Sequence, residues 1–289
     1  FTTRLMNTLY IFRSPFFLRF KYLLNINTMK KILVPTDFSN EAENAIKVAA
    51  QLSRKHNCEL ILLNMLDLPL THISEGVPAD LPEAVYFMKL AHKQFEDVMS
   101  KPYLSDITVT EMVDIHDIST GILETYKKED IDLIVMGSHG SSGLKEMFIG
   151  SNAEKIVRAS NKPVLVIKNE HENFDIEEFV FASDFKNDSR ETYKQAVKLA
   201  ETFNAKIHLL MVNTVSNFTT TASAKVKIQE FIEGTNFTNY TTNIYNDKTV
   251  EKGILNFSHI INADLIGIST HGRQGIAHFL NGSLSEDLV

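Results

Sequence analysis

The stretch that decides the fold is Gly137-Ser-His-Gly-Ser-Ser-Gly-Leu-Lys-Glu-Met-Phe-Ile-Gly-Ser151, a glycine-rich loop between two regular elements. Before it, residues 132–136 (Asp-Leu-Ile-Val-Met) form a short apolar run, typical of a parallel strand covered on both faces. At its end, Ser151-Asn-Ala-Glu154 has the Ser-x-x-Glu spacing of a capping box, which predicts a helix that begins at Ser151. Strand, loop and helix in this order indicate an α/β fold.

This loop has two interpretations. Gly137 and Gly140 allow a tight turn or a close approach of the backbone to a ligand, while Gly150, Ser151 and Asn152 would offer free amides at the positive end of a helix dipole. That combination predicts a phosphate-binding loop. The alternative is a well-capped turn in which Ser151 caps its helix and nothing binds. The glycine spacing alone leaves both interpretations open.

The chain around the loop alternates strands and helices. Strands are expected at residues 31–34, 59–66, 107–113, 132–136 and 163–168, and helices at 40–55, 82–99, 119–128 and from 151 onward. Such alternation predicts right-handed crossovers and a parallel, doubly wound sheet.

The same order then recurs. Residues 179–185 (Phe-Val-Phe-Ala-Ser-Asp-Phe) echo 32–38, and residues 264–272 repeat 132–140. We therefore expect two tandem Rossmann-like domains, residues 29–169 and 170–289, each a doubly wound, mainly parallel five-stranded sheet. A polar, acidic linker near residues 169–177 joins them.

The second repeat stops at Val289, inside its expected last helix, so we expect it to lack its last strand. Strand 163–168 of the first domain is then expected to be an exposed edge that is open to another chain.

Residues 1–28 form an N-terminal extension of a different character. They contain Arg4, Arg13, Arg19 and Lys21 but no acidic residue, and their apolar runs are too short for a membrane span. A transit peptide is a closer match than a secretory signal. The alternative, which we favour, is a translated leader that is not part of the native protein, with Met29 as the true start.

Composition limits the function. The chain has 289 residues, 44% hydrophobic and 22% charged, which is typical of a soluble globular protein of two domains. The net charge of −7, without a basic stripe, disfavours a nucleic-acid partner. Cys58 is the single cysteine, so the chain has no internal disulfide framework, and we expect a cytoplasmic protein with no membrane partner.

Several catalytic and binding motifs are absent from the sequence. No Gly-x-Gly-x-x-Gly follows the first strand, no P-loop pattern occurs, and residues 140–143 lack the spacing of a serine-hydrolase elbow. His139 and His271 occupy matching loop positions, but no partner at ligand spacing supports a metal site. We therefore assign no catalytic residue and no metal ligand.

What does match is Gly137-x2-Gly140-x9-Gly150-Ser151 together with Pro35-Thr36-Asp37 at the end of the first strand. This combination, with Met136-Gly-Ser-His-Gly140 and Ser160-Asn-Lys-Pro-Val-Leu-Val166, resembles the ATP-binding branch of the universal stress protein family. The resemblance spans about residues 30 to 289 as two tandem domains.

The resemblance implies a site for an adenine nucleotide. Asp37 and Met65 would contact the base and ribose, Met136 and Gly137 would line the same crevice, and Gly140, Gly150, Ser151 and Asn152 would hold the phosphates. Pro35 and Thr36 belong to the same site through the strand-end motif. The cofactor implied is ATP, with or without Mg²⁺, which the nucleotide itself would mainly hold.

The second repeat departs from this pattern. Its candidate site is Asp184, Ser269, Gly272, Gly282 and Ser283. Ser269 replaces the first glycine and adds a Cβ where the backbone would need a close approach or a positive φ. We therefore interpret this half as a degenerate site.

The leading functional hypothesis is a nucleotide-binding stress-response or regulatory protein with ATP in the first domain and, at most, slow hydrolysis. The two domains would associate as an intramolecular pseudo-dimer, or the chain as a homodimer. The alternative is an adaptor that binds no nucleotide and acts through protein partners. An adenylate-transferring enzyme is disfavoured, because neither a His-x-Gly-His pattern nor a Ser-Gly-Gly-x-Asp-Ser loop occurs.

Overall fold

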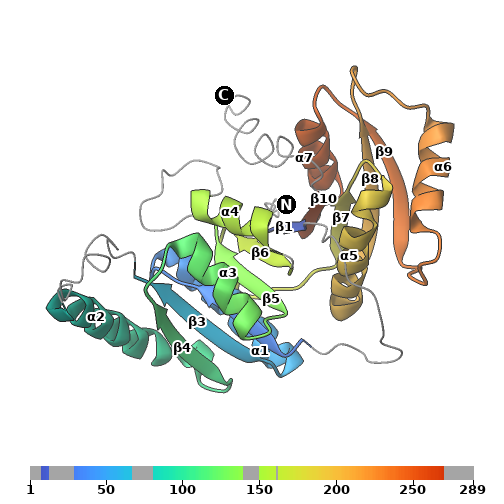
Figure 1. Cartoon of the computed structure of the whole chain (residues 1–289). Coiled ribbons are helices and arrows are strands. Elements are labelled where there is room, and N and C mark those ends of the chain that lie inside the picture. The colour runs from blue at the N-terminus through green and yellow to red at the C-terminus, as the bar shows by residue number, and fades with distance from the viewer. Residues whose placement is uncertain (1–7, 13–28, 67–80, 139–149, 161, 270–289) are drawn as a thin grey trace, which may run out of the picture.

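The computed structural model describes residues 8–12, 29–66, 81–138, 150–160 and 162–269. In its first half, the elements are β2 (Lys31–Pro35), α1 (Asn40–His56), β3 (Glu59–Met65), α2 (Leu81–Met99), β4 (Val109–Asp114), α3 (Ile118–Lys128), β5 (Leu133–Gly137), α4 (Ser151–Ala159) and β6 (Val164–Ile167). A strand of the N-terminal extension, β1 (Thr8–Phe12), precedes them (Figure 1).

The second half repeats this order. Its elements are β7 (Glu178–Ala182), α5 (Arg190–Phe203), β8 (Lys206–Asn213), α6 (Thr221–Ile232), β9 (Tyr240–Asn246), α7 (Val250–Ile260) and β10 (Leu265–Ser269). The domain boundary at residues 169 and 170 stays a prediction.

The described strands form one ten-stranded sheet in the order β4-β3-β2-β5-β6-β1-β10-β7-β8-β9. Strands β4, β3, β2, β5 and β6 are mutually parallel, and so are β10, β7, β8 and β9. The predicted class, two tandem doubly wound α/β units of which the second contributes four strands of its own, is confirmed. The register repeats as well, since Lys31 faces Glu59 in the first half and Glu178 faces Lys206 in the second.

The apolar core lies in two layers because successive side chains of a strand point to opposite faces. On β2, Ile32 and Val34 join the layer under α1, α2, α5 and α6, whereas Leu33 joins the layer under α3, α4 and α7. Both layers run through both halves of the sheet. All three of these side chains are completely buried, which explains why the strand reads as a continuous apolar run.

The turn after the first strand of each half is built in the same way. Thr36 Oγ1 accepts the Phe38 amide at 3.0 Å, and Ser183 Oγ accepts the Phe185 amide at 2.9 Å. Phe38 and Phe185 have φ values of 61° and 54°, an uncommon conformation for bulky residues. Each ring packs edge-on against a helix of its own half, Phe38 on Phe95 and Phe185 on Phe231. The two halves therefore repeat each other in structure as well as in sequence.

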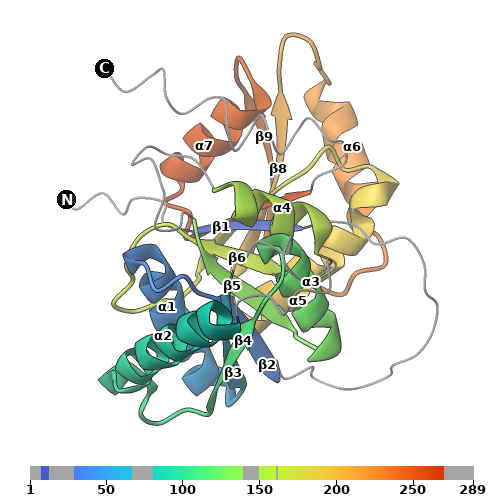
Figure 2. The ribbon, with the colours of Figure 1, turned by 60° about the vertical axis from the view of Figure 1, so that its left-hand side comes forward.

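One expectation about the sheet is wrong. Strand 163–168 was expected to be an open edge, but β6 pairs antiparallel with β1, which in turn pairs parallel with β10. Figures 1 and 2 both show β1 alongside β6 near the centre of the molecule. The strand that covers the edge comes from the N-terminal extension, which sequence reasoning had assigned to a leader and therefore left out of the sheet.

The segment that joins the halves lies along α1. Lys47 pairs with Glu170 at 2.5 Å, Gln51 bonds the backbone of residues 171 and 174, and Lys55 pairs with Asp175 at 3.1 Å. These three side chains are spaced four residues apart, so they share one face of the helix. The predicted polar linker is thus a strap of residues 170–175 that is fastened along α1.

Candidate functional site

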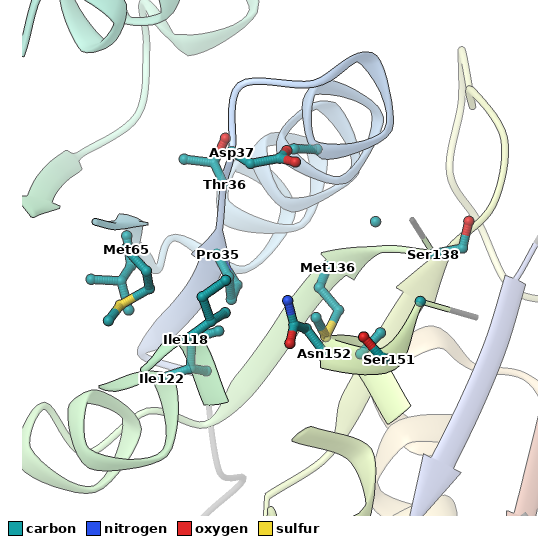
Figure 3. Close-up of a pocket in the computed structure, with 15 residues that line it drawn as sticks. Pro35, Thr36, Asp37, Met65, Ile118, Ile122, Met136, Ser138, Ser151 and Asn152 are labelled. Carbon is teal, nitrogen blue, oxygen red and sulfur yellow. The ribbon is translucent and has the colours of Figure 1, made fainter. Parts of the chain in front are cut away.

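A pocket opens at the carboxyl ends of β2, β3 and β5, between the first turns of α3 and α4. Its volume is about 270 Å³ (Figure 3). Nine of the ten predicted nucleotide-site residues line it: Pro35, Thr36, Asp37, Met65, Met136, Gly137, Gly150, Ser151 and Asn152. The tenth, Gly140, lies outside the described residues. Parallel strands place ligand sites at this edge, where helix N-termini converge.

The pocket has an apolar end and a polar end. Met65, Ile118 and Ile122 lie at one end, and Ser138 and Ser151 at the other, with Met136 between them (Figure 3). An arrangement of this kind suits a flat apolar group with a polar or anionic extension.

Sequence reasoning missed six lining residues: Ala42, Leu63, Ile118, Ile122, Ser138 and Ala153. Ser138 and Ala153 directly adjoin predicted site residues, and Leu63 and Ala42 lie within five positions of one. Ile118 and Ile122 had no local signal, because only the crossover from β4 brings the start of α3 to this edge.

Helix α3 is held at the pocket by its N-cap. Asp117 accepts hydrogen bonds from Ser119 Oγ at 2.7 Å and from the amide and hydroxyl of Thr120 at 3.1 and 3.0 Å. These bonds, the one from Ser119 foremost, hold the pKa of the Asp117 carboxyl below its ordinary value. The cap fixes the first turn of α3 and with it the two isoleucines of the pocket.

The start of α4 differs from the predicted capping box. Ser151 is the first helical residue, the N-cap is Gly150, and no side chain caps the helix. The predicted helix start at Ser151 is confirmed, whereas the interpretation in which the Ser151 side chain caps the helix is wrong. The Gly150 amide donates to the Ser138 carbonyl at 2.5 Å, and the first intrahelical bond runs from Glu154 to Gly150. The amides of Ser151, Asn152 and Ala153 precede that bond and face the pocket end of the helix.

Asp37 combines the two roles that the sequence left open. The residue is exposed and lines the pocket, and its Oδ1 accepts the Ser39 amide at 3.1 Å, as a turn aspartate does. Ser39 in turn caps α1 by accepting the Ala42 amide at 3.2 Å. The carboxylate is thereby held in place beside the cavity.

Gly137 is required for a different reason from the one expected. Its φ is not positive, and a Cβ there would lie 2.8 Å from the backbone carbon and oxygen of Glu41. The glycine therefore lets the first turn of α1 approach β5 directly. Met65 has a similar relation to α3, since a Cβ on Gly121 would lie 2.1 Å from its Cε.

The second half has the same order of strands and helices as the first, but residues at the corresponding site differ. Asp184 accepts the Lys186 amide at 3.3 Å, and it also pairs with Lys186 Nζ at 2.7 Å. Lys186 stands where Ser39 stands in the first half. At the position of Met65 the second half has Val212, which is 7% exposed and would collide at 2.4 Å with a Cβ on Gly253.

The rest of the second candidate site is only partly described. Ser269 ends β10, whereas Gly272, Gly282 and Ser283 lie outside the described residues. Opposite the position of Ser269, the chain that corresponds to the first turn of α1 forms a 3₁₀ turn, Asn187–Ser189. The helical turn that packs on Gly137 in the first half thus corresponds to a 3₁₀ turn in the second.

The described residues include neither a metal-binding cluster nor a membrane-spanning helix. No group of three or more His, Cys, Asp or Glu side chains in that part of the chain is arranged to hold a metal ion. None of the helices described is both long enough and apolar enough to cross a bilayer. His139 and His271 lie outside this part of the chain.

Fold and site define a tandem, doubly wound α/β protein with a ligand-sized pocket at the carboxyl edge of its first half. Residues 28–168 match the model of the universal stress protein family. The universal stress protein MJ0577 of Methanocaldococcus jannaschii is 34% identical over 160 residues, which cover 48% of this chain and 94% of that protein. The chain belongs to the universal stress protein family.

Solved structures extend the likeness in fold to both halves. A universal stress protein from Archaeoglobus fulgidus matches with a TM-score of 0.63 and 20% identity, over 82% of this chain and 86% of that one. The functionally unknown protein PA1789 from Pseudomonas aeruginosa matches with a TM-score of 0.54 and 18% identity, over 89% and 87%. These identities support the shared tandem fold alone.

Proposed function

We propose that this protein binds ATP in the pocket of its first half and acts in the cytoplasm as a stress-response or regulatory protein. The observation that carries the proposal is that the strand-end motif, Gly137, Gly150 and the start of α4 line one pocket. These segments are far apart in the sequence, and the motif that singled them out is that of the ATP-binding branch of the family.

The chemistry of the lining fits the parts of a nucleotide. The apolar end, with Met65, Ile118 and Ile122, offers a surface for a base, and Asp37 offers an acceptor for ribose hydroxyls. At the polar end, the amides of Ser151, Asn152 and Ala153 and the dipole of α4 suit phosphate groups. A volume of about 270 Å³ is near the lower end of the range for small-molecule pockets.

The same lining supports binding rather than turnover. Among the described residues that form it, Asp37 is the one ionisable side chain, and its Oδ1 already holds the turn to Ser39. General-base catalysis needs a group positioned on the attacking water. We therefore expect hydrolysis to be slow. Mg²⁺, where present, would be held mainly by the phosphates.

The test begins with the ligand that the protein carries. Protein purified without added nucleotide is denatured, and the released material is analysed by absorbance and mass. We expect an adenine nucleotide, or, from nucleotide-free protein, heat of binding on titration with ATP. Absence of both would contradict the proposal and favour the alternative, an adaptor that acts through protein partners.

A further inference from the structure

Strand β1 has the position in the second half that β6 has in the first. In the first half, β6 lies parallel to β5, with Gly137 facing Ile167. In the second half, β1 lies parallel to β10, with Ser269 facing Phe12. Gly137 and Ser269 are equivalent residues, so β1 keeps the same register on β10 that β6 keeps on β5.

The seam between β1 and β6 is symmetric. By the equivalence just described, Tyr10 corresponds to Leu165, and these two residues face each other across the antiparallel pair. Leu9 faces Val166 and Ile11 faces Val164, which exchange under the same two-fold relation. In a symmetric dimer, each subunit presents equivalent positions to the other, which is called an isologous interface. The β1–β6 pair has this geometry within one chain.

Strand β1 lies between β6 and β10, in a position that we call the β6–β10 slot. The slot is apolar, and without β1 both neighbouring strands would have an unpaired edge. Val164, Leu165, Val166 and Ile167 of β6 are at most 2% exposed, and Leu265 and Ile266 of β10 are equally buried. Among the described strands, β1 alone pairs with the edge of β6 that faces away from β5 and with the edge of β10 that faces away from β7. Unpaired edges of this composition are prone to associate with other chains.

We propose that Thr8–Phe12 is a strand supplied in cis by the N-terminal segment, which completes the sheet of the second half and fastens that half to the first. Its sequence, Thr-Leu-Tyr-Ile-Phe, is rich in residues that favour strands. The β6–β10 slot is accordingly an interaction surface for one extended segment, bound by strand addition on both sides. The chain thereby contains its own pseudo-two-fold interface.

A cysteine pair tests the register directly. Residues that face each other on antiparallel strands have Cα atoms about 4.5–5.5 Å apart, which a disulfide can bridge, whereas a shift of two residues exceeds its reach of about 7 Å. Leu9→Cys with Val166→Cys should form a disulfide on mild oxidation. The matched control, Leu9→Cys with Val164→Cys, should not. The natural Cys58 is buried, and burial raises the pKa of its thiol to about 11, so it should not compete.

The products distinguish the outcomes. We expect the facing pair to migrate as a monomer on a non-reducing gel, with one intrachain link between positions 9 and 166 by mass spectrometry. Equal linkage of both pairs, linkage of neither, or linkage between two chains would overturn the proposal.

Hydrogen exchange on a second variant does not depend on disulfide formation. Proline in a paired central strand removes a ladder hydrogen bond, so Tyr10→Pro should release β1. We expect amide exchange to rise at least about tenfold in Val164–Ile167 and Leu265–Ser269 while Lys31–Pro35 stays protected. Tyr10→Val, which keeps strand propensity, should retain the wild-type pattern. Unchanged exchange in Tyr10→Pro would contradict the proposal.

Discussion

Gly137 and Gly121 both border the pocket region, but their missing side chains matter for different reasons. A Cβ on Gly137 would meet backbone atoms of Glu41 at 2.8 Å, whereas one on Gly121 would meet the end of the Met65 side chain at 2.1 Å. Backbone in a helix cannot move without its neighbours. Methionine is flexible and can change rotamer.

The two glycines therefore predict unequal costs of substitution. Gly137→Ala should lower the free energy of unfolding by about 1–3 kcal/mol, as overpacking does. Gly121→Ala should cost less, because Met65 can move and alanine favours the helix by up to about 1 kcal/mol. Urea unfolding of both variants measures the difference. An equal or larger loss for Gly121→Ala would show that the Met65 side chain is more tightly fixed than this argument allows.

A substitution of Asn152 tests whether phosphates bind at the start of α4. Asn152 is in the first turn of α4, where a carboxylate is favourable to the helix by about 0.3–1 kcal/mol but repels a phosphate. Asn152→Asp should therefore weaken ATP binding at least about tenfold while stability is kept or raised. Calorimetry and thermal unfolding measure the two effects.

The matched control places the same charge elsewhere. Ala222→Asp introduces a carboxylate at the same position of the first turn of α6, away from the pocket. It should leave ATP affinity unchanged. If both variants bind ATP like the wild type, phosphates do not lie at α4.

The residues of the pocket were predictable to different degrees. Gly137, Gly150, Ser151 and Asn152 follow from the glycine spacing and the helix start, which are local signals, whereas Met65 and Met136 were predicted from the resemblance to the family. The helix begins at Ser151 as predicted, but Gly150 is the N-cap, so the Ser151 side chain does not have the capping role that the Ser-x-x-Glu pattern suggested. The contribution of Ile118 and Ile122 depends on the crossover, which no local pattern encodes.

At the scale of elements, α1 connects the pocket with the second half. Its first turn packs on Gly137, and its later turns hold the strap of residues 170–175. Near its end, Lys55 lies over the ring of Phe203 in α5, 5.0 Å from the centroid. One helix thus touches the pocket strand, the strap and a helix of the other half.

Gln51 is the central fastening of that strap. Its amide donates to the His171 carbonyl at 3.1 Å and accepts from the Phe174 amide at 2.7 Å. Gln51→Ala should speed amide exchange and proteolysis within residues 170–175, with a loss of about 1–2 kcal/mol in unfolding free energy. The exposed Gln229→Ala serves as control. A strap that is equally protected in both variants would contradict a fastening role.

His56, at the end of α1, gives a pH dependence. Burial, and then the nearby charge of Lys55, lowers the pKa of His56 below its ordinary 6.5. Its Nε2 is buried and has no hydrogen-bond partner in the structure. The unfolded chain then binds the proton more readily, so stability should fall as the pH drops from about 6.5 toward the folded-state pKa.

The comparison uses His56→Gln, which cannot take up that proton. Urea unfolding at about pH 7.5 and about pH 5.5 should show a smaller acid loss in the variant than in the wild type. Equal losses in the two proteins would mean that His56 has no share in the acid sensitivity.

Some strands of the sheet could be predicted from the sequence, and one could not. Strands β2, β3, β5 and β7 are apolar runs with clear breaks, and their existence follows from burial on both faces. Strand β1 has a similar run, but its place depends on pairing with residues more than 150 positions away. The arginine-rich surroundings of residues 8–12 resembled a transit peptide, and the strand that begins just after Met29 favoured the leader interpretation instead.

For the whole molecule, the two halves share a fold but differ at several positions that correspond to the pocket region of the first half. Because β6 and β1 are antiparallel, the carboxyl edges of the two halves lie at opposite ends of the sheet. Two lining residues of the first pocket, Gly137 and Met65, correspond to Ser269 and Val212 in the second half. Ser39, which caps α1, corresponds to Lys186. This asymmetry predicts one nucleotide per chain.

The stoichiometry of ATP binding therefore tests the central claim most directly. Nucleotide-free protein is titrated with ATP in a calorimeter, together with Asn152→Asp as a variant of the first pocket alone. We predict one ATP per chain for the wild type and a strong loss of affinity in the variant. Two ATP per chain, one ATP that Asn152→Asp does not weaken, or no binding at all would contradict a single nucleotide site in the first half.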